Sequence, residues 1–172
     1  STVTAQTPDS RPNVLITFAS LDASPLYRFF NPTSGDHFYS ITDTVPPQGY
    51  VAEGIAAYVY PNANTQGVAP LHRFFNSVNG DHFYSIDPTV PLGYVYECVC
   101  CYFFRSQVVS SVPFYRFLNP TSGDHFYSTD PTVPAGYVSE GICCYVRPSA
   151  NPFGTFSPSN QCTTDATGKC SV

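Results

Sequence analysis

The chain has 172 residues, a length that suits one domain with a hydrophobic core. Charged residues make up only 11% of the chain and the net charge is −5 at pH 7, which argues against a nucleic-acid partner. No apolar run reaches the length needed to cross a membrane. Tyr and Phe supply all the aromatic residues, and 17 Pro with 11 Gly indicate many turns, as in an all-β protein.

One long motif occurs three times. Residues 27–40 read YRFFNPTSGDHFYS, residues 115–128 read YRFLNPTSGDHFYS, and a looser copy covers residues 72–85. A second motif follows each copy as GYVAEGIAAY, GYVYECVCCY and GYVSEGICCY. Internal repeats of this length decide the architecture. The sequence therefore predicts one domain, residues 1–172, built from the repeats 26–70, 71–113 and 114–158, with a lead at 1–25 and a tail at 159–172.

Each repeat contains strand patterns separated by turn residues. In the first repeat the strands are expected at residues 26–30, 37–40, 50–53 and 55–60. A turn with Pro and Gly at residues 31–36 and a Pro-rich loop at 43–48 separate them. No segment shows helical spacing with caps.

Four strands taken three times predict a β-trefoil of twelve strands with pseudo-threefold symmetry. A small β-propeller is the alternative, because four strands also form a blade. Propellers usually have at least four blades, so three repeats favour the trefoil. A β-sandwich does not explain the triplication.

Charges recur at fixed places in the repeats although they are scarce elsewhere. An Arg and a Glu in each repeat are interpreted as a partly buried ion pair that fixes the strands of that repeat. The predicted structural pairs are Arg28 with Glu53, Arg73 with Glu97, and Arg116 with Glu140.

The residues around the HFYS block are the predicted carbohydrate site. A carboxylate and an amide would accept the hydroxyl donors of a sugar, and a flat ring would stack on its C–H face. In each block His and Tyr are expected on one strand face and Phe on the other. The competing interpretation is that Asn and Asp form ordinary Asx turns and that Tyr packs in the core. The predicted set is Asn31, Asp36, His37, Tyr39, Asn76, Asp81, His82, Tyr84, Asn119, Asp124, His125 and Tyr127.

No catalytic, metal or cofactor site is predicted. Asp36 and His37 are neighbours on a strand and should face opposite ways, and no G-x-S-x-G motif occurs. The three repeated glutamates should lie too far apart for a paired-carboxylate glycosidase. Three histidines around an axis could bind a metal, but the repeated loops are expected at the periphery.

Seven cysteines and the absence of an initiator Met favour a mature secreted protein. An odd number leaves one thiol free or joined to another chain. One member of each neighbouring pair should face the core and the other should face away. The disulfide candidates are Cys98, Cys100, Cys101, Cys143, Cys144, Cys162 and Cys170, of which the last two enclose a short loop.

The block R-F-x-N-x-x-x-G-D-H-F-Y-S, followed by G-Y-V-x-E-G-I-x-x-Y, resembles a repeat of secreted fungal and bacterial proteins that accompanies cell-wall hydrolases in some bacteria. The chain is also similar to the lectin-like small subunit of heterodimeric fungal laccases. These resemblances imply a noncatalytic module that binds cell-wall glycans or stabilises a larger enzyme. The chain has no Trp and so lacks the Gln-x-Trp signature of ricin-type trefoil lectins.

The sequence therefore predicts a secreted, noncatalytic, lectin-like module. Its expected partners are glycans or a larger extracellular enzyme subunit, with no nucleic acid and no membrane. The alternative is a trefoil protease inhibitor, which needs an exposed nonrepeating loop. Gln66-Gly67-Val68 and Ser106-Gln107-Val108 are the candidates for such a loop.

Overall fold

The computed structural model describes residues 23–151, 163–164 and 170–171, and every regular element in this part of the chain is a β-strand. The all-β prediction is confirmed. No helix in these residues is long and apolar enough to cross a membrane. The strands of the repeats are β1 Ser24–Phe30, β2 His37–Ser40, β3 Val51–Val59, β4 Val68–Phe75, β5 His82–Ser85, β6 Val95–Phe104, β7 Val112–Leu118, β8 His125–Ser128 and β9 Val138–Val146. The short strands β10 Thr163–Thr164 and β11 Cys170–Ser171 pair in the tail.

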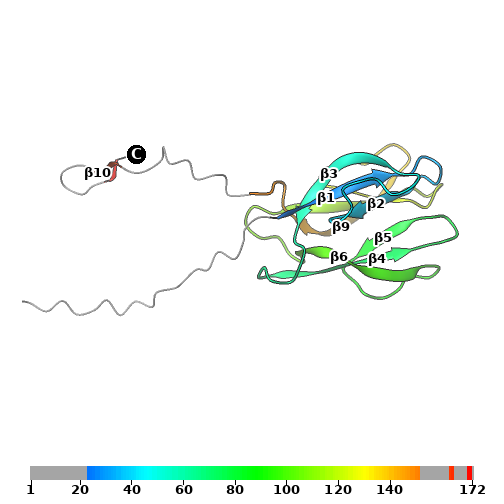
Figure 1. Cartoon of the computed structure of the whole chain (residues 1–172), viewed down its shortest axis with the longest axis horizontal. Coiled ribbons are helices and arrows are strands. Elements are labelled where there is room, and N and C mark those ends of the chain that lie inside the picture. Colours follow the sequence, from blue (N-terminus) through cyan, green and yellow to red (C-terminus); the bar gives the residue numbers. More distant parts are fainter. Residues whose placement is uncertain (1–22, 152–162, 165–169, 172) are drawn as a thin grey trace, which may run out of the picture.

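Each repeat forms one antiparallel sheet of three strands. The order is β2-β1-β3 in the first repeat and β5-β4-β6 in the second (Figure 1). The third repeat follows the same plan with the order β8-β7-β9. A pair between Phe104 and Tyr145 joins the second and third sheets into one of six strands. Two isolated bridges, Tyr58 to Arg147 and Tyr60 to Tyr102, bring the end of β3 to the ends of β9 and β6. The three long strands therefore meet at one end around a pseudo-threefold axis.

The repeats supply three strands each, where the sequence predicts four. The expected strands at residues 50–53 and 55–60 are one continuous strand, β3, with register shifts at Glu53 and Ala56. These shifts are β-bulges, in which two residues on one strand oppose one on its partner. Gly54, read as a break between strands, lies between the two bulges with φ of +93°. The described strands do not close into a barrel, so a twelve-strand trefoil is not confirmed.

The three sheets share one core. It contains Leu26, Leu71 and Phe114 from the central strands and Val59, Phe103 and Val146 from the long strands. Tyr39, Tyr84 and Tyr127 complete it from the short inner strands. No single sheet could bury these side chains alone, so the repeats depend on one another for a core.

The turn between the first two strands of each repeat is closed by its own Asn. Asn31 Oδ1 accepts the backbone N–H groups of Thr33 and Ser34 at 2.9 and 3.2 Å. The turn then passes through Gly35 with φ of +81°, a conformation that glycine adopts without strain. The turn delivers Asp36 to the start of β2, next to the axis.

Candidate functional site

Three buried aspartates meet near the pseudo-threefold axis. Asp36, Asp81 and Asp124 are each 1–2% exposed. One carboxylate oxygen from each lies within 4.8 Å of the others. The expectation that the repeated loops lie at the periphery is therefore wrong for these residues. The turns bring them together because the three inner strands surround the axis.

Each aspartate binds the histidine of the next repeat. Asp36 Oδ1 accepts the backbone N–H of His82 at 2.8 Å, and its Oδ2 accepts the ring Nδ1–H at 2.6 Å. Asp36 Oδ2 also accepts the hydroxyl of Tyr50, from its own repeat, at 2.6 Å. Burial, and then the hydrogen bond to Asp36, raise the pKa of Tyr50. One carboxylate thus ties two repeats together.

The same contacts continue around the axis. Asp81 binds the backbone and ring of His125 at 2.8 and 2.6 Å. Asp124 returns to His37 of the first repeat at 2.7 and 2.6 Å. Tyr94 and Tyr137 donate to these two aspartates as Tyr50 donates to Asp36. The contacts form a closed cycle in which every repeat is both acceptor and donor.

The other ring nitrogen of each histidine faces a glutamate of its own repeat. His37 Nε2 lies 3.3 Å from Glu53 Oε1, and the corresponding distances are 3.8 Å to Glu97 and 3.4 Å to Glu140. Each glutamate occupies a bulge, where the extra residue can aim its side chain out of the regular alternation. The imidazole therefore lies between a carboxylate of the preceding repeat and one of its own.

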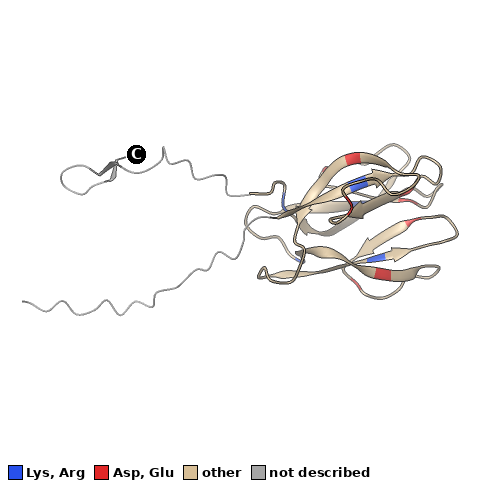
Figure 2. Cartoon of the chain, viewed as in Figure 1, with Lys and Arg blue, Asp and Glu red and all other residues tan. Residues whose placement is uncertain are grey.

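The glutamates also bind the repeated arginines. Arg28 Nε donates to Glu53 at 2.9 Å, and the Arg73–Glu97 and Arg116–Glu140 distances are 2.6 and 2.8 Å. Figure 2 shows the acidic positions on β3 and β6 beside the basic positions on β1 and β4. Arg28 also stacks on Phe126 of the preceding repeat at 4.9 Å, and the other two arginines make the equivalent contact. The ion pair lies within a repeat, but the stacking crosses between repeats.

A second cycle joins the tyrosines of the HFYS blocks. The hydroxyl of Tyr84 donates to the carbonyl of Tyr39 at 2.9 Å and accepts the N–H of Tyr39 at 2.7 Å. Tyr127 binds the backbone of Tyr84 in the same way, and Tyr39 binds the backbone of Tyr127. Burial raises the pKa of all three phenols well above the ordinary value. The hydroxyls thus replace strand pairing between the inner strands.

The predicted carbohydrate residues are mostly buried by these two cycles. Every residue of β2 is buried, so the expected alternation leaves no exposed face. The three tyrosines are at most 1% exposed and cannot stack on a sugar in this arrangement. Asn31, Asn76 and Asn119 cap their turns. In the described part of the chain the Asp, His and Tyr residues of the set make contacts between repeats, and the Asn residues close turns within their own repeats.

The buried polar side chains of the described residues are all satisfied. No buried side-chain nitrogen or oxygen there lacks a hydrogen-bond partner. The three aspartates are close enough together to suggest a metal ligand set, but both oxygens of each already accept hydrogen bonds. The hydrogen bonds of this network join the repeats to one another. Its missed members, Tyr50, Tyr94 and Tyr137, have a sequence signal, since each is the Tyr of a repeated G-Y-V.

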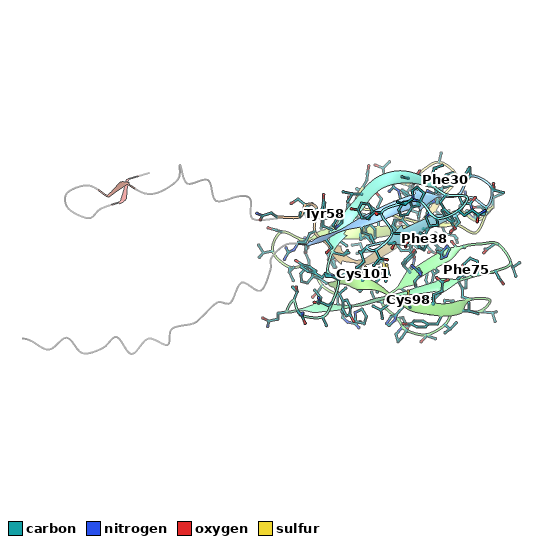
Figure 3. The ribbon with its side chains drawn as sticks, viewed as in Figure 1. Phe30, Phe38, Tyr58, Phe75, Cys98 and Cys101 are labelled. Carbon is teal, nitrogen blue, oxygen red and sulfur yellow. The ribbon has the colours of Figure 1, made fainter. Side chains whose placement is uncertain are left out.

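Five of the predicted disulfide candidates are free thiols in the structure: Cys98, Cys100, Cys101, Cys143 and Cys144. Cys101 and Cys98 are labelled on β6 in Figure 3. The core contains Cys101 and Cys144, and their neighbours Cys100 and Cys143 pack against the same core. The prediction that one member of each pair faces the core is confirmed for Cys101 and Cys144, but the other member does not face away as expected. A bridge between Cys162 and Cys170 lies outside the described residues.

No curated protein and no solved structure matches the sequence. A family model matches two overlapping segments, residues 12–89 and 85–154, which fits an internal repeat. On this evidence the chain belongs to the family described as a domain of unknown function, DUF5648.

Proposed function

We propose that this chain is a noncatalytic accessory module of a larger secreted enzyme. It binds the enzyme subunit through its outer strands β3, β6 and β9. The observation that carries the proposal is a division among the repeated residues. The repeated charged and polar residues are engaged in contacts within and between the repeats, whereas repeated apolar residues on the outer strands face solvent.

The exposed apolar residues lie on the first halves of the three outer strands. Val51 is 52% exposed and Ile55 is 48% exposed on β3. The equivalent residues of the other repeats are exposed as well: Val95, Val99, Val138 and Ile142. An exposed apolar strand is a typical site of contact with another protein.

The backbone of these half-strands is also open on one side. The sheet order places β3 at an edge, and β6 meets β9 only at Phe104 and Tyr145. Among the described residues, Val51–Ile55 therefore has a strand partner on one side only. Such an edge can pair with an extended segment of a partner, while its side chains fit apolar pockets. Threefold repetition offers the same contact three times.

The resemblance to the small subunit of heterodimeric laccases supplies the partner to test. Purified full-length chain is mixed with the catalytic subunit of such a laccase, and sedimentation velocity measures complex formation. We expect a complex and slower thermal inactivation of the oxidase. If the two proteins sediment separately, the accessory role with this class of partner is refuted. A glycan array that then shows binding would assign a sugar-binding function instead.

Variants locate the contact. The triple variant Ile55→Lys, Val99→Lys and Ile142→Lys places a charge on every outer strand, and Lys on an edge opposes strand pairing. We expect it to lose the complex while staying folded. Val109→Lys is the matched control, because Val109 is 76% exposed and lies in a loop between β6 and β7. Equal binding by both variants would rule out the outer strands.

A further inference from the structure

The bulges of β6 and β9 each contain a pair of cysteines that are neighbours in the sequence. Cys144 pairs with Phe114 and Ile142 pairs with Tyr115, so Cys143 is the extra residue of the β9 bulge. Two residues of a bulge oppose one on the partner strand, which breaks the usual alternation of side chains. Both thiols of the pair consequently contact the same core. Cys100 and Cys101 repeat this arrangement on β6.

The two thiols of the third repeat differ in acidity. Contact with the Cys144 thiol, the largest influence, and the charge of Arg116 lower the pKa of Cys143, although burial opposes this. Burial, and then Cys143, raise the pKa of Cys144. Cys143 is also the more accessible of the two, since Cys144 is only 1% exposed. A partly exposed thiol with a lowered pKa beside a buried thiol is the arrangement of an attacking and a resolving cysteine.

We propose that Cys143 and Cys144 are a redox site that forms a reversible vicinal disulfide by exchange with a small disulfide such as oxidised glutathione. The Cys143 thiolate attacks one sulfur of the small disulfide, whose S–S bond breaks and releases one small thiol. The Cys144 thiolate then attacks the Cys143 sulfur, forms the bond between the neighbours and releases the second small thiol. The protein loses two electrons and two protons, and the small disulfide gains both.

The bond is reversible because of its geometry. Neighbouring Cα atoms lie about 3.8 Å apart across a trans peptide. Disulfides usually join Cα atoms about 4.4–6.8 Å apart, and departures from this range store strain that favours reduction. Reduced glutathione alone should therefore reopen the ring, which distinguishes it from a structural disulfide.

The first repeat supplies a natural control. It has Ala56 and Ala57 at the positions of Cys143 and Cys144, with the same bulge at Ala56. The fold thus accommodates two alanines there. The double variant Cys143→Ala and Cys144→Ala should fold and lose the redox site.

The test follows one peptide. Reduced full-length chain is incubated with oxidised glutathione at several ratios to reduced glutathione, quenched with acid, unfolded and alkylated. Cleavage after Tyr137 and Tyr145 releases residues 138–145, which contain only these two cysteines. We expect this peptide to be lighter by two hydrogen atoms and to take up no alkyl group. Raising reduced glutathione should restore two alkylatable thiols.

A second variant checks the order of attack. Cys144→Ala removes the resolving thiol, so Cys143 should accumulate a mixed disulfide with glutathione. Cys143→Ala should lose most of this adduct, because the thiol left behind is buried. A wild-type peptide that keeps two thiols at every ratio, retains glutathione without closing, or is joined to another cysteine would overturn the proposal.

Discussion

The inner strands β2, β5 and β8 and the outer strands β3, β6 and β9 carry the same threefold repetition but use it differently. The inner strands meet near the axis, where Asp, His and Tyr side chains bind across the boundaries between repeats. The outer strands turn repeated apolar residues to solvent in their first halves. The comparison teaches that a repeated residue is not by itself a surface site. The repeated Asp, His and Tyr residues hold the repeats together, whereas the repeated apolar residues of the outer strands remain exposed to solvent.

The largest loss of stability is expected when one carboxylate next to the inner strands is removed. Asp124→Ala leaves the backbone N–H and ring of His37 and the hydroxyl of Tyr137 without their acceptor. A buried donor left without its acceptor costs about 1–3 kcal/mol, and this variant leaves three such donors. We expect a loss of at least this size in the free energy of unfolding measured with urea. Asp130→Ala is the control, since Asp130 caps an exposed loop. Similar losses in both variants would contradict the cohesive role of Asp124.

A smaller loss is expected when the tyrosine cycle is opened. Tyr84→Phe removes the hydroxyl that binds both the N–H and the carbonyl of Tyr39. A buried backbone group without a partner costs about 1–3 kcal/mol. Urea unfolding should show this loss for Tyr84→Phe, and Tyr39→Phe and Tyr127→Phe should match it by symmetry. Tyr96→Phe is the control, because its hydroxyl meets only His72 in the described contacts and is exposed. Unequal losses among the three would break the threefold equivalence.

Alkaline pH tests the same cycle without mutation. Burial raises the pKa of Tyr39, Tyr84 and Tyr127 in the folded chain, so the unfolded chain loses these phenol protons first as the pH rises. The contribution of these tyrosines to stability should therefore stay constant below about pH 10, the ordinary pKa of tyrosine, and should be lost above it. Tyrosinate absorbance and circular dichroism should change together. Gradual titration of every tyrosine in a chain that stays folded would contradict this expectation.

The smallest effect is expected in the exposed first halves of the outer strands. Val138→Thr changes a half-exposed residue, and surface substitutions usually alter stability by less than about 0.5 kcal/mol. Val59→Thr makes the same chemical change at a residue that is 1% exposed. The buried hydroxyl there should cost about 1–3 kcal/mol. Equal losses in the free energy of unfolding would show that the first half of β9 is not the exposed surface that the comparison of inner and outer strands requires.

The sequence predicts what lies within one repeat. Triplication, the all-β class, the turn at Asn31 and the residues that pair as Arg28 and Glu53 can all be read from local patterns. The strand count could not be read in this way, because Gly54 looks like a break between two strands. In the middle repeat Cys98 holds that position, and β6 continues through it. A bulge and a turn have similar local signals, and only pairing with β1 or β4 separates them.

The contacts between repeats could not be predicted from the sequence. Asp36 binds His82, 46 residues away, and not its neighbour His37. Local reasoning placed Asp36 at the end of a turn and His37 on one face of a strand, and it expected the repeated loops at the periphery, because Asp beside a Gly turn is common at surfaces. The burial of His37, Phe38, Tyr39 and Ser40 on both faces is the consequence of three inner strands packing around one axis. One repeat alone carries no signal for that arrangement.

The direction of the inter-repeat contacts has a consequence for the history of the chain. Each aspartate binds the repeat that follows it, and the last returns to the first. The N–H of Ala23 donates to the carbonyl of Ala150 at 3.2 Å, so the two ends of the three-repeat body lie side by side. A lone copy therefore has both halves of a head-to-tail interface, and three separate copies can close a ring. Gene duplication of a peptide that once trimerised would produce this body, and circular permutation between repeats would preserve all of its contacts.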